Sequence, residues 1–297
     1  GSNLVDKLIQ KNHLVYGLDN LITGSLKNLD HLKSNNKFEF IHHDVTKYID
    51  VNDKIDFVFH LASPASPVDY LNYPIQTLKA NAIGGHNALG LAKKNNAKFI
   101  LASTSEIYGD PLVHPQSENY YGNVNPIGPR SIYDESKRFI ESMTVSYHAY
   151  HKLRVSIIRI FNTYGPRMKI DDGRVLPTFI KQASENSDIT INGDGYQTRS
   201  FCYIDDLIDG FLKIMDLNYF NPINLGNDDE VTINNIALFI LKTLDSQSRI
   251  VYKDMPKDDP LKRKPDITLA KSILNWNPIT SKEKGIKMLI DYYKEKK

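Results

Sequence analysis

Two short segments of the chain carry side chains that could move a proton and a hydride. The first is the run Ser-Thr-Ser-Glu at residues 103–106, which follows the apolar residues 99–102 and is expected where a buried strand opens into a loop. The second is the pair Tyr133 and Lys137, which lie one helical turn apart and so share one helix face. If the fold brings the two segments together, hydroxyl groups, a carboxylate, a phenol and an ammonium converge on one pocket.

The phenol of Tyr133 is the candidate base of this group. An isolated tyrosine has a pKa of about 10 and is a poor base near neutrality. A nearby ammonium, and the positive charge of an oxidised nicotinamide ring, both favour the phenolate and are expected to lower the pKa of Tyr133 toward the working pH. Tyr133 could then take the proton of a sugar hydroxyl, while Thr104 or Ser105 donates a hydrogen bond to the same oxygen.

The Tyr-x-x-x-Lys spacing alone is weak evidence, because Tyr292–Lys296 and Tyr293–Lys297 share it. Only the pair Tyr133–Lys137 lies in a predicted helix that follows a strand ending in hydroxyl side chains. The two C-terminal pairs are interpreted as the solvated end of a helix.

The hydrophobic pattern predicts the elements that must position both segments. Apolar runs of strand length alternate with helical patterns, which favours a parallel sheet with crossover helices. Predicted strands are 13–18, 38–42, 56–61, 99–102 and 153–161; predicted helices are 2–10, 73–94, 131–150, 234–244, 267–274 and 284–294. The alternation loosens after the last of these strands. We therefore expect a Rossmann-like, doubly wound α/β domain over residues 1–165. Residues 166–297 are expected to form mainly a smaller substrate-binding lobe, interleaved with the last sheet strands.

In such a sheet, ligands bind beyond the carboxyl ends of the strands. Asp19, Asp44, Ala62-Ser63 and residues 103–106 follow four predicted strands and should line one crevice. An acidic residue after the second strand is where dinucleotide-binding folds hold the ribose hydroxyls. The alternative for Asp19 is an ordinary turn residue. His60 is interpreted as a packed strand residue.

Composition narrows the functional classes. The chain has 37 basic and 35 acidic residues and a net charge of +2, without a long block of one sign, which argues against nucleic-acid binding. The single cysteine, Cys202, excludes an internal disulfide, and no stretch of about eighteen apolar residues predicts a membrane span. We predict a cytoplasmic location and no metal site. A membrane anchor upstream of Gly1 would instead place the protein in a secretory lumen.

Several motifs occur together in one order: HLASPASP, ASTSEIYGDP, SIYDESK, RIFNTYGPRM, DDGRV, QTRSF, NLGN and DDPLKRKPDI. With these motifs the chain resembles the extended short-chain dehydrogenase/reductase superfamily, and more narrowly its UDP-glucuronate decarboxylase (UDP-xylose synthase) family. The resemblance runs from Gly1 to the C-terminal helix. It departs from the family at the start, where GSNLV matches only the end of the motif GGxGFxGS. We therefore expect the first strand and two glycines upstream of Gly1.

The resemblance implies NAD as cofactor, with Asp19 on the adenosine ribose disfavouring the added phosphate of NADP. The residues implied in NAD binding are Gly1, Asp19, Asn20, Asp44, Val45, Leu61, Ala62, Ser63, Lys79, Asn81, Tyr133 and Lys137. The residues implied in binding the nucleotide sugar are Pro64, Glu106, Asn162, Arg167, Arg174, Val175, Arg199, Tyr203 and Arg263. Any one of these arginines taken alone could be an ordinary surface charge. The family also implies a homodimer, formed through the helices 73–94 and 131–150.

Ser105 selects among the reactions of the superfamily. The related 4,6-dehydratases carry an Asp there, which protonates the departing hydroxyl, so its replacement removes elimination and leaves oxidation at C4. A C4 ketone beside a C5 carboxylate is a β-keto acid that can lose carbon dioxide, and Glu106 could position water or return the proton to C5. The catalytic residues implied are Thr104, Ser105, Glu106, Tyr133, Lys137 and Arg263.

We therefore predict conversion of UDP-glucuronate to UDP-xylose with recycled NAD. The alternatives are another epimerase or dehydratase of nucleotide sugars, a decarboxylase that releases the 4-keto pentose, and a nucleotide-binding scaffold without turnover.

Overall fold

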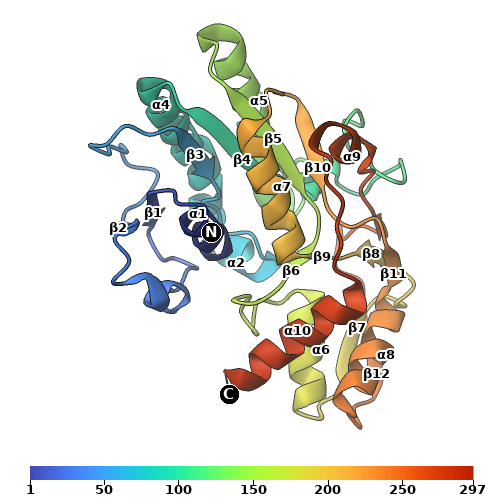
Figure 1. The fold of residues 1–297 in the computed structure, drawn as a ribbon. Coiled ribbons are helices and arrows are strands. Elements are labelled where there is room, and N and C mark those ends of the chain that lie inside the picture. The colour runs from blue at the N-terminus through green and yellow to red at the C-terminus, as the bar shows by residue number, and fades with distance from the viewer. Residues whose placement is uncertain (297) are drawn as a thin grey trace.

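The computed structural model describes residues 1–296, and its largest sheet is parallel throughout (Figure 1). This sheet has the order β10-β5-β4-β3 and contains β3 (Phe57–His60), β4 (Lys98–Thr104), β5 (Val155–Ile160) and β10 (Pro222–Leu225). A separate parallel pair is formed by β1 (Val15–Asp19) and β2 (Phe38–His42). All five predicted strands are present, and the parallel α/β prediction is confirmed.

Helices cover both faces of the central sheet. Ile100 and Ala102 of β4 pack in one apolar cluster with α1 (Ser2–Gln10), α7 (Ile204–Asp216) and α9 (Thr268–Leu274). Phe99 and Leu101 of the same strand pack in another cluster with α4 (Gly85–Asn95) and α5 (Ser131–His151). Successive residues of a strand point to opposite faces of the sheet. Because helices cover both faces here, the residues 99–102 of β4 are all apolar. The doubly wound architecture is thereby confirmed.

A further apolar core lies in the C-terminal half. It is built by α6 (Val175–Ser184), α8 (Ile233–Leu244) and α10 (Lys282–Glu295) around the parallel pair of β7 (Ile189–Asn192) and β12 (Ile250–Lys253). Two small sheets lie nearby: β11 (Glu230–Thr232), β8 (Thr198–Ser200) and β13 (Lys262–Arg263) in one, and β6 (Thr163–Tyr164) with β9 (Cys202–Tyr203) in the other. Three other elements of the C-terminal half, α7, β10 and α9, pack instead in the apolar cluster that covers one face of the central sheet.

Three α-helices were not predicted: α2 (Pro67–Asn72), α6 and α7. Gly210 lies inside α7 and masked its helical pattern, since glycine disfavours helix interiors. A Cβ on Gly210 would approach Leu225 of β10 to 2.5 Å, so the helix needs glycine to lie this close to the sheet. The signals that mark this helix are Asp205 and Asp206 in its first turn and the buried residues at helical spacing that follow.

The long predicted helix over 73–94 is divided in three. It consists of α3 (Pro74–Lys79), a π-helical segment η2 (Ala80–Gly84) and α4. Single π-helical turns often mark functional positions, and this one carries Asn81, one of the residues predicted to bind the cofactor.

The interpretation of the C-terminal tyrosines as a solvated helix end is wrong for Tyr293. This side chain is 8% exposed in the C-terminal core, and its hydroxyl donates a hydrogen bond to the Met168 carbonyl at 3.0 Å, because α10 turns an apolar face inward. Lys297 lies outside the described residues. Among residues 1–296, no helix combines the length and the apolar composition that crossing a bilayer requires.

Candidate active site

The two predicted segments meet at the carboxyl end of β4. The Nζ of Lys137 on α5 donates a hydrogen bond to the Ala102 carbonyl at 2.9 Å and lies 5.7 Å from the centre of the Tyr133 ring. Thr104, the last residue of β4, makes a side-chain hydrogen bond with Tyr133. Ser105 begins the short 3-10 helix η3 (Ser105–Tyr108) and is buried beside them. The structure thus brings the predicted hydroxyls, phenol and ammonium together.

The ionisation of the pair differs from the prediction. Burial raises the pKa of Tyr133 to about 12, and the hydrogen bond from Thr104 lowers it only in part. Burial also lowers the pKa of Lys137 to about 8, against the opposing influence of Glu141. In the protein alone, burial of the phenol therefore outweighs the groups that favour the phenolate. The predicted lowering of the pKa of Tyr133 by an ammonium together with an oxidised nicotinamide stays a prediction.

Glu106 is held by two arginines from distant parts of the chain. Arg130 Nη2 contacts Oε2 at 2.5 Å, and Arg263 Nη1 contacts Oε1. Arg263 is 2% exposed, and its Nη2 also donates to the Gly109 carbonyl at 3.0 Å. Burial by itself would raise the pKa of Glu106, but Arg263 and Arg130 overcome it and hold the value at about 2. Glu106 therefore stays ionised near neutrality, which favours positioning of water over the predicted return of a proton to C5.

Two further charged residues complete this group. Asp259 accepts hydrogen bonds from Arg130 Nη1 at 3.2 Å and from Arg199 Nη2 at 3.0 Å. We call Glu106, Arg130, Arg199, Asp259 and Arg263 the arginine cluster. Its three cations and two anions leave one positive charge, which suits an anionic ligand.

Sequence reasoning missed Arg130 and Asp259. Arg130 stands three residues before Tyr133, one turn away at the start of α5, and this spacing could have indicated it. Asp259 lies in an irregular segment, where no local pattern predicts its partners.

Two neighbours of Tyr133 were also missed. The Tyr70 ring stacks on that of Tyr133 with centres 5.4 Å apart and planes at 8°. Asp134 is 5% exposed, and its Oδ1 has no hydrogen-bond partner among the described residues. Burial and the charge of Glu106 raise the pKa of Asp134 to about 8, so this carboxyl is mostly protonated at neutral pH.

A cleft of about 430 Å³ lies beyond the carboxyl end of β1. Its lining includes Gly1, Leu18, Asp19, Arg167 and Arg174. The Oδ1 of Asp19 accepts a hydrogen bond from the Leu21 amide at 2.7 Å. A Cβ on Gly24 would lie 3.1 Å from the Asp19 carboxylate, so glycine keeps this loop close to the acid. An acid at the strand end and two arginines in the lining fit the ribose and phosphates of a dinucleotide.

Other residues predicted for the cofactor lie at neighbouring strand ends. Asn20 donates a side-chain hydrogen bond to Asp44, whose pKa is lowered first by the Thr46 amide, then by the Thr46 side chain and by Asn20. Asn81 Nδ2 donates to Ser63 Oγ at 2.9 Å and to Ser136 Oγ at 3.0 Å, which ties η2 to the end of β3 and to α5. Leu61 and Ala62 follow β3 and are half-buried, as is Val45.

Several predicted residues lie away from the arginine cluster. Arg167 lines the β1 cleft and pairs with Asp6 at 2.6 Å, because the loop after β6 turns back toward α1. Tyr203 is 3% exposed and packs edge-on against Tyr164 in the C-terminal core, so its ring is not free to contact a ligand. Lys79 is exposed at the end of α3 and has no hydrogen bond or ion pair with any residue in the described range.

Arg174 lies between the β1 cleft and Tyr133, and three other predicted residues are buried or half-buried elsewhere. Arg174 pairs with Asp172 at 2.6 Å, lines the β1 cleft and lies near enough to Tyr133 to lower its pKa. Val175 begins α6 and packs on the C-terminal core. Pro64 is buried, and the half-buried Asn162 accepts a hydrogen bond from the Cys202 amide at 2.8 Å through its carbonyl.

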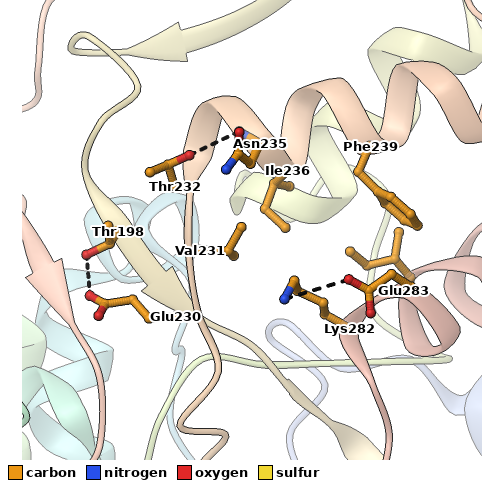
Figure 2. Close-up of a pocket in the computed structure, with 10 residues that line it drawn as sticks. Thr198, Glu230, Val231, Thr232, Asn235, Ile236, Phe239, Lys282 and Glu283 are labelled. Atoms are coloured by element: carbon orange, nitrogen blue, oxygen red, sulfur yellow. Dashed lines mark hydrogen bonds and ion pairs between the residues drawn. The ribbon is translucent and has the colours of Figure 1, made fainter.

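A separate cavity of about 500 Å³ contains none of the predicted residues (Figure 2). It lies between β11, α8 and α10, where Thr198 donates a hydrogen bond to Glu230 and Lys282 lies beside Glu283. Thr198 and Arg199 are successive residues of β8 and point to opposite faces, so this cavity is not part of the arginine cluster.

Comparisons with known proteins identify the family of the chain. Residues 1–226 match the NAD dependent epimerase/dehydratase family. The chain is 47% identical over 296 residues to UDP-glucuronic acid decarboxylase 2 of Arabidopsis thaliana, covering 100% of this chain and 66% of that protein. It is 46% identical over 295 residues to UDP-glucuronic acid decarboxylase 1 of Xenopus tropicalis, covering 99% of this chain and 70% of that protein. The chain thus spans about two thirds of the length of these relatives.

Solved structures give the same fold at lower identity. UDP-glucose 4-epimerase of Thermotoga maritima, with UDP-glucose, superposes with a TM-score of 0.89 at 28% identity and covers 100% of this chain and 96% of that one. UDP-glucuronic acid 4-epimerase of Bacillus cereus, with UDP-glucuronic acid and NAD, gives a TM-score of 0.88 at 28% identity with the same coverage.

Proposed function

Because the chain belongs to the NAD dependent epimerase/dehydratase family, we propose that it is an NAD-dependent carboxy-lyase that converts UDP-glucuronate to UDP-xylose. The observation that carries the proposal is the Glu106–Arg263 ion pair beside Tyr133 and Lys137. The relatives named as UDP-glucuronic acid decarboxylases, at 46–48% identity, support the choice of reaction. We also propose residues 1–165 as the NAD-binding domain and residues 166–297 as mainly the nucleotide-sugar lobe.

In this proposal the arginine cluster binds and orients the substrate. A guanidinium presents paired donors in a plane that matches a carboxylate or a phosphate. Arg130, Arg199 and Arg263 converge from the N-terminal end of α5, from β8 and from β13. Arg199 and Arg263 are buried, which strengthens their interaction with an anion. These side chains can therefore fix the sugar with its C4 hydroxyl toward Tyr133.

The proton of that hydroxyl passes to Tyr133. NAD, when bound near Asp19 and Lys137, supplies the hydride acceptor at C4 and later the hydride donor. Lys137 and Arg174 favour the Tyr133 phenolate against the burial that raises its pKa, and the positive charge of bound NAD would act in the same sense. Thr104 donates a hydrogen bond to the same substrate oxygen and stabilises its charge.

Loss of carbon dioxide follows from the C4 ketone. The electrons of the breaking C5–carboxylate bond pass into an enolate, whose oxygen is held by Tyr133 and Thr104. Ser105 offers no acid for elimination. Glu106, ionised by its two arginines, can orient the water that supplies the C5 proton.

The test is incubation of the protein with UDP-glucuronate and NAD while carbon dioxide and the nucleotide product are followed. We expect stoichiometric carbon dioxide, UDP-xylose and no net NADH. Unchanged UDP-glucuronate, or its conversion to UDP-galacturonate, would overturn the proposal. Accumulation of NADH with a 4-keto pentose would mean that the ketone is released without being reduced, and only the last step of the proposal would change. The cytoplasm stays the predicted compartment, and fractionation of cells that express the tagged protein tests it.

We further propose a homodimer through the predicted helices 73–94 and 131–150, which in the structure are α3, η2 and α4 and, for the second, α5. These elements pack beside one another and expose large apolar side chains, among them Ile75, Ile83 and Phe139, at 56%, 44% and 50%. Such a face favours burial against a second copy. Sedimentation of the protein and of Phe139→Asp tests this; a monomeric parent protein would overturn it.

A further inference from the structure

A buried polar network lies behind the pocket, and none of the steps above uses it. Its centre is Arg159 on β5, which donates from Nε to Glu141 Oε1 at 3.1 Å and from Nη2 to Oε2 at 2.8 Å. Each residue is 9% exposed. Burying two charges costs free energy unless further hydrogen bonds satisfy them. Here Arg159 makes a further hydrogen bond to Tyr108, and Glu141 accepts one from Ser103.

In one direction the network reaches Gln116, which contacts the residue that follows β13. Arg159 Nη1 donates to the Tyr108 hydroxyl at 3.0 Å, and this hydroxyl donates to Asn224 Oδ1 at 2.8 Å. Asn224 Nδ2 in turn donates to the Gln116 carbonyl at 3.0 Å. Tyr108, Asn224 and Gln116 are each 0% exposed, so these bonds are made without competition from water.

This end of the network holds both members of the Glu106–Arg263 pair. Tyr108 lies two residues after Glu106 in the same short helix η3. Gln116 makes two hydrogen bonds with Lys264, the residue after Arg263. The side-chain Oε1 of Gln116 accepts from the Lys264 backbone amide at 2.9 Å, and the backbone amide of Gln116 donates to the Lys264 carbonyl at 2.9 Å. A shift of Tyr108 would therefore move the ion pair, although Tyr108 touches neither member by a hydrogen bond.

In the other direction the network reaches α5. Glu141 accepts a hydrogen bond from Ser103 and lies one turn beyond Lys137, on the helix face that also carries Tyr133. Its negative charge opposes the loss of the proton from Lys137.

We propose that the network of Glu141, Arg159, Tyr108 and Asn224 positions the catalytic groups, by fixing the Glu106–Arg263 pair at one end and by holding the Glu141 carboxylate one helical turn from Lys137 at the other. These are positioning residues, since they act through Glu106, Arg263 and Lys137. The inference rests on the proposed function only in treating those three groups as the working site. Its tests use whichever nucleotide sugar the parent protein turns over, so a wrong substrate would show in the parent and not in the variants.

The first test is Tyr108→Phe, which deletes the hydroxyl and leaves the ring. We expect kcat/KM for the nucleotide sugar to fall about tenfold, the size expected for one buried partner left unsatisfied, with its KM raised and the KM for NAD unchanged. The matched control is Tyr120→Phe: its ring stacks on Tyr108 with centres 6.0 Å apart, but its hydroxyl contacts the Leu112 amide, outside the network. Unchanged kinetics in Tyr108→Phe, or a fall in kcat with both KM values unchanged, would overturn the positioning role.

The second test concerns the charge of Lys137. The groups that face Lys137 are Glu141 and Tyr133 on α5 and His60 on β3, whose pKa burial lowers to about 3, so that it is neutral. Replacing Glu141 by glutamine removes the one carboxylate of this set. We expect the alkaline limb of the kcat/KM profile to move to lower pH, whereas a merely structural role would lower activity equally at every pH.

A third variant keeps the inference testable if Glu141→Gln does not fold. Arg159→Lys retains the charge beside Glu141 but loses the fork that reaches Glu141 and Tyr108 together. We expect it to raise the KM of the nucleotide sugar as Tyr108→Phe does, with the alkaline limb unmoved because Glu141 remains. A shifted limb with an unchanged KM would contradict the proposed division of labour.

Discussion

The Tyr133–Lys137 pair and the arginine cluster lie side by side but are assembled in different ways. Tyr133 and Lys137 are neighbours on α5, so one helix sets their separation. The arginine cluster joins residues that lie 24 to 157 positions apart in the sequence. Its ion pairs therefore form only when the tertiary structure brings these distant segments together. The comparison shows where a single substitution acts: in the pair it removes a chemical group, and in the cluster it also leaves a buried partner uncompensated.

The largest effect should come from the pair. Tyr133→Phe removes the group that takes the C4 proton, and we expect kcat to fall by about 10³-fold, with NAD binding retained. Steady-state turnover and NAD titration measure this. The control is Tyr292→Phe, in the C-terminal Tyr-x-x-x-Lys match, which should turn over at the parent rate. Activity of Tyr133→Phe within tenfold of the parent protein would remove Tyr133 from the mechanism.

The next largest effect should come from the cluster. Arg130→Ala takes one cation from Glu106 and one from Asp259, and we expect kcat/KM to fall about 10²-fold, as when one partner of a buried pair is lost. Arg249→Ala is the matched control, because its pair with Asp188 is exposed. Equal kinetics for the two variants would mean that the cluster does not bind substrate.

A smaller effect is expected on the cofactor side. Asp19→Ala removes the carboxylate beyond β1, and we expect the KM for NAD to rise about tenfold while the preference over NADP decreases. Asp30→Ala, in an exposed pair with Lys33, serves as control. An unchanged ratio of the two cofactors would make Asp19 the ordinary turn residue of the alternative interpretation.

The smallest effect is a pH dependence that separates the two regions. The pKa of Lys137 is lowered to about 8, so its ammonium is present below that pH and is lost as the pH rises through it. Since kcat/KM reports the free protein, we expect it to fall to about half near pH 8. Glu106, with a pKa held at about 2, should contribute no limb between pH 4 and 7. A flat profile to pH 10 would show that the charge of Lys137 is not required.

Much of the site followed from local pattern. The i, i+4 spacing of Tyr133 and Lys137 and the apolar run before Ser103 are short-range features, and they predicted the strand end and the helix. That the two segments meet was only a condition of the sequence interpretation, and the structure supplies it. The same patterns failed for α7, where Gly210 is required by the approach to Leu225, a contact that sequence spacing does not reveal. Arg167 and Tyr203 matched family motifs, but the first lines the β1 cleft and the second is buried in the C-terminal core.

The sequence by itself determined the parallel α/β class, the shared helix face of Tyr133 and Lys137, and the family, because helical and strand periods and ordered motifs are local properties of the chain. Only the tertiary structure decided that Arg130, Asp259 and the Arg159 network belong to the site, since their partners come from separate elements. It also decided the ionisation of Tyr133, Lys137 and Glu106. Each pKa depends on burial and on charges brought near by folding, and the sequence around a residue does not contain either quantity.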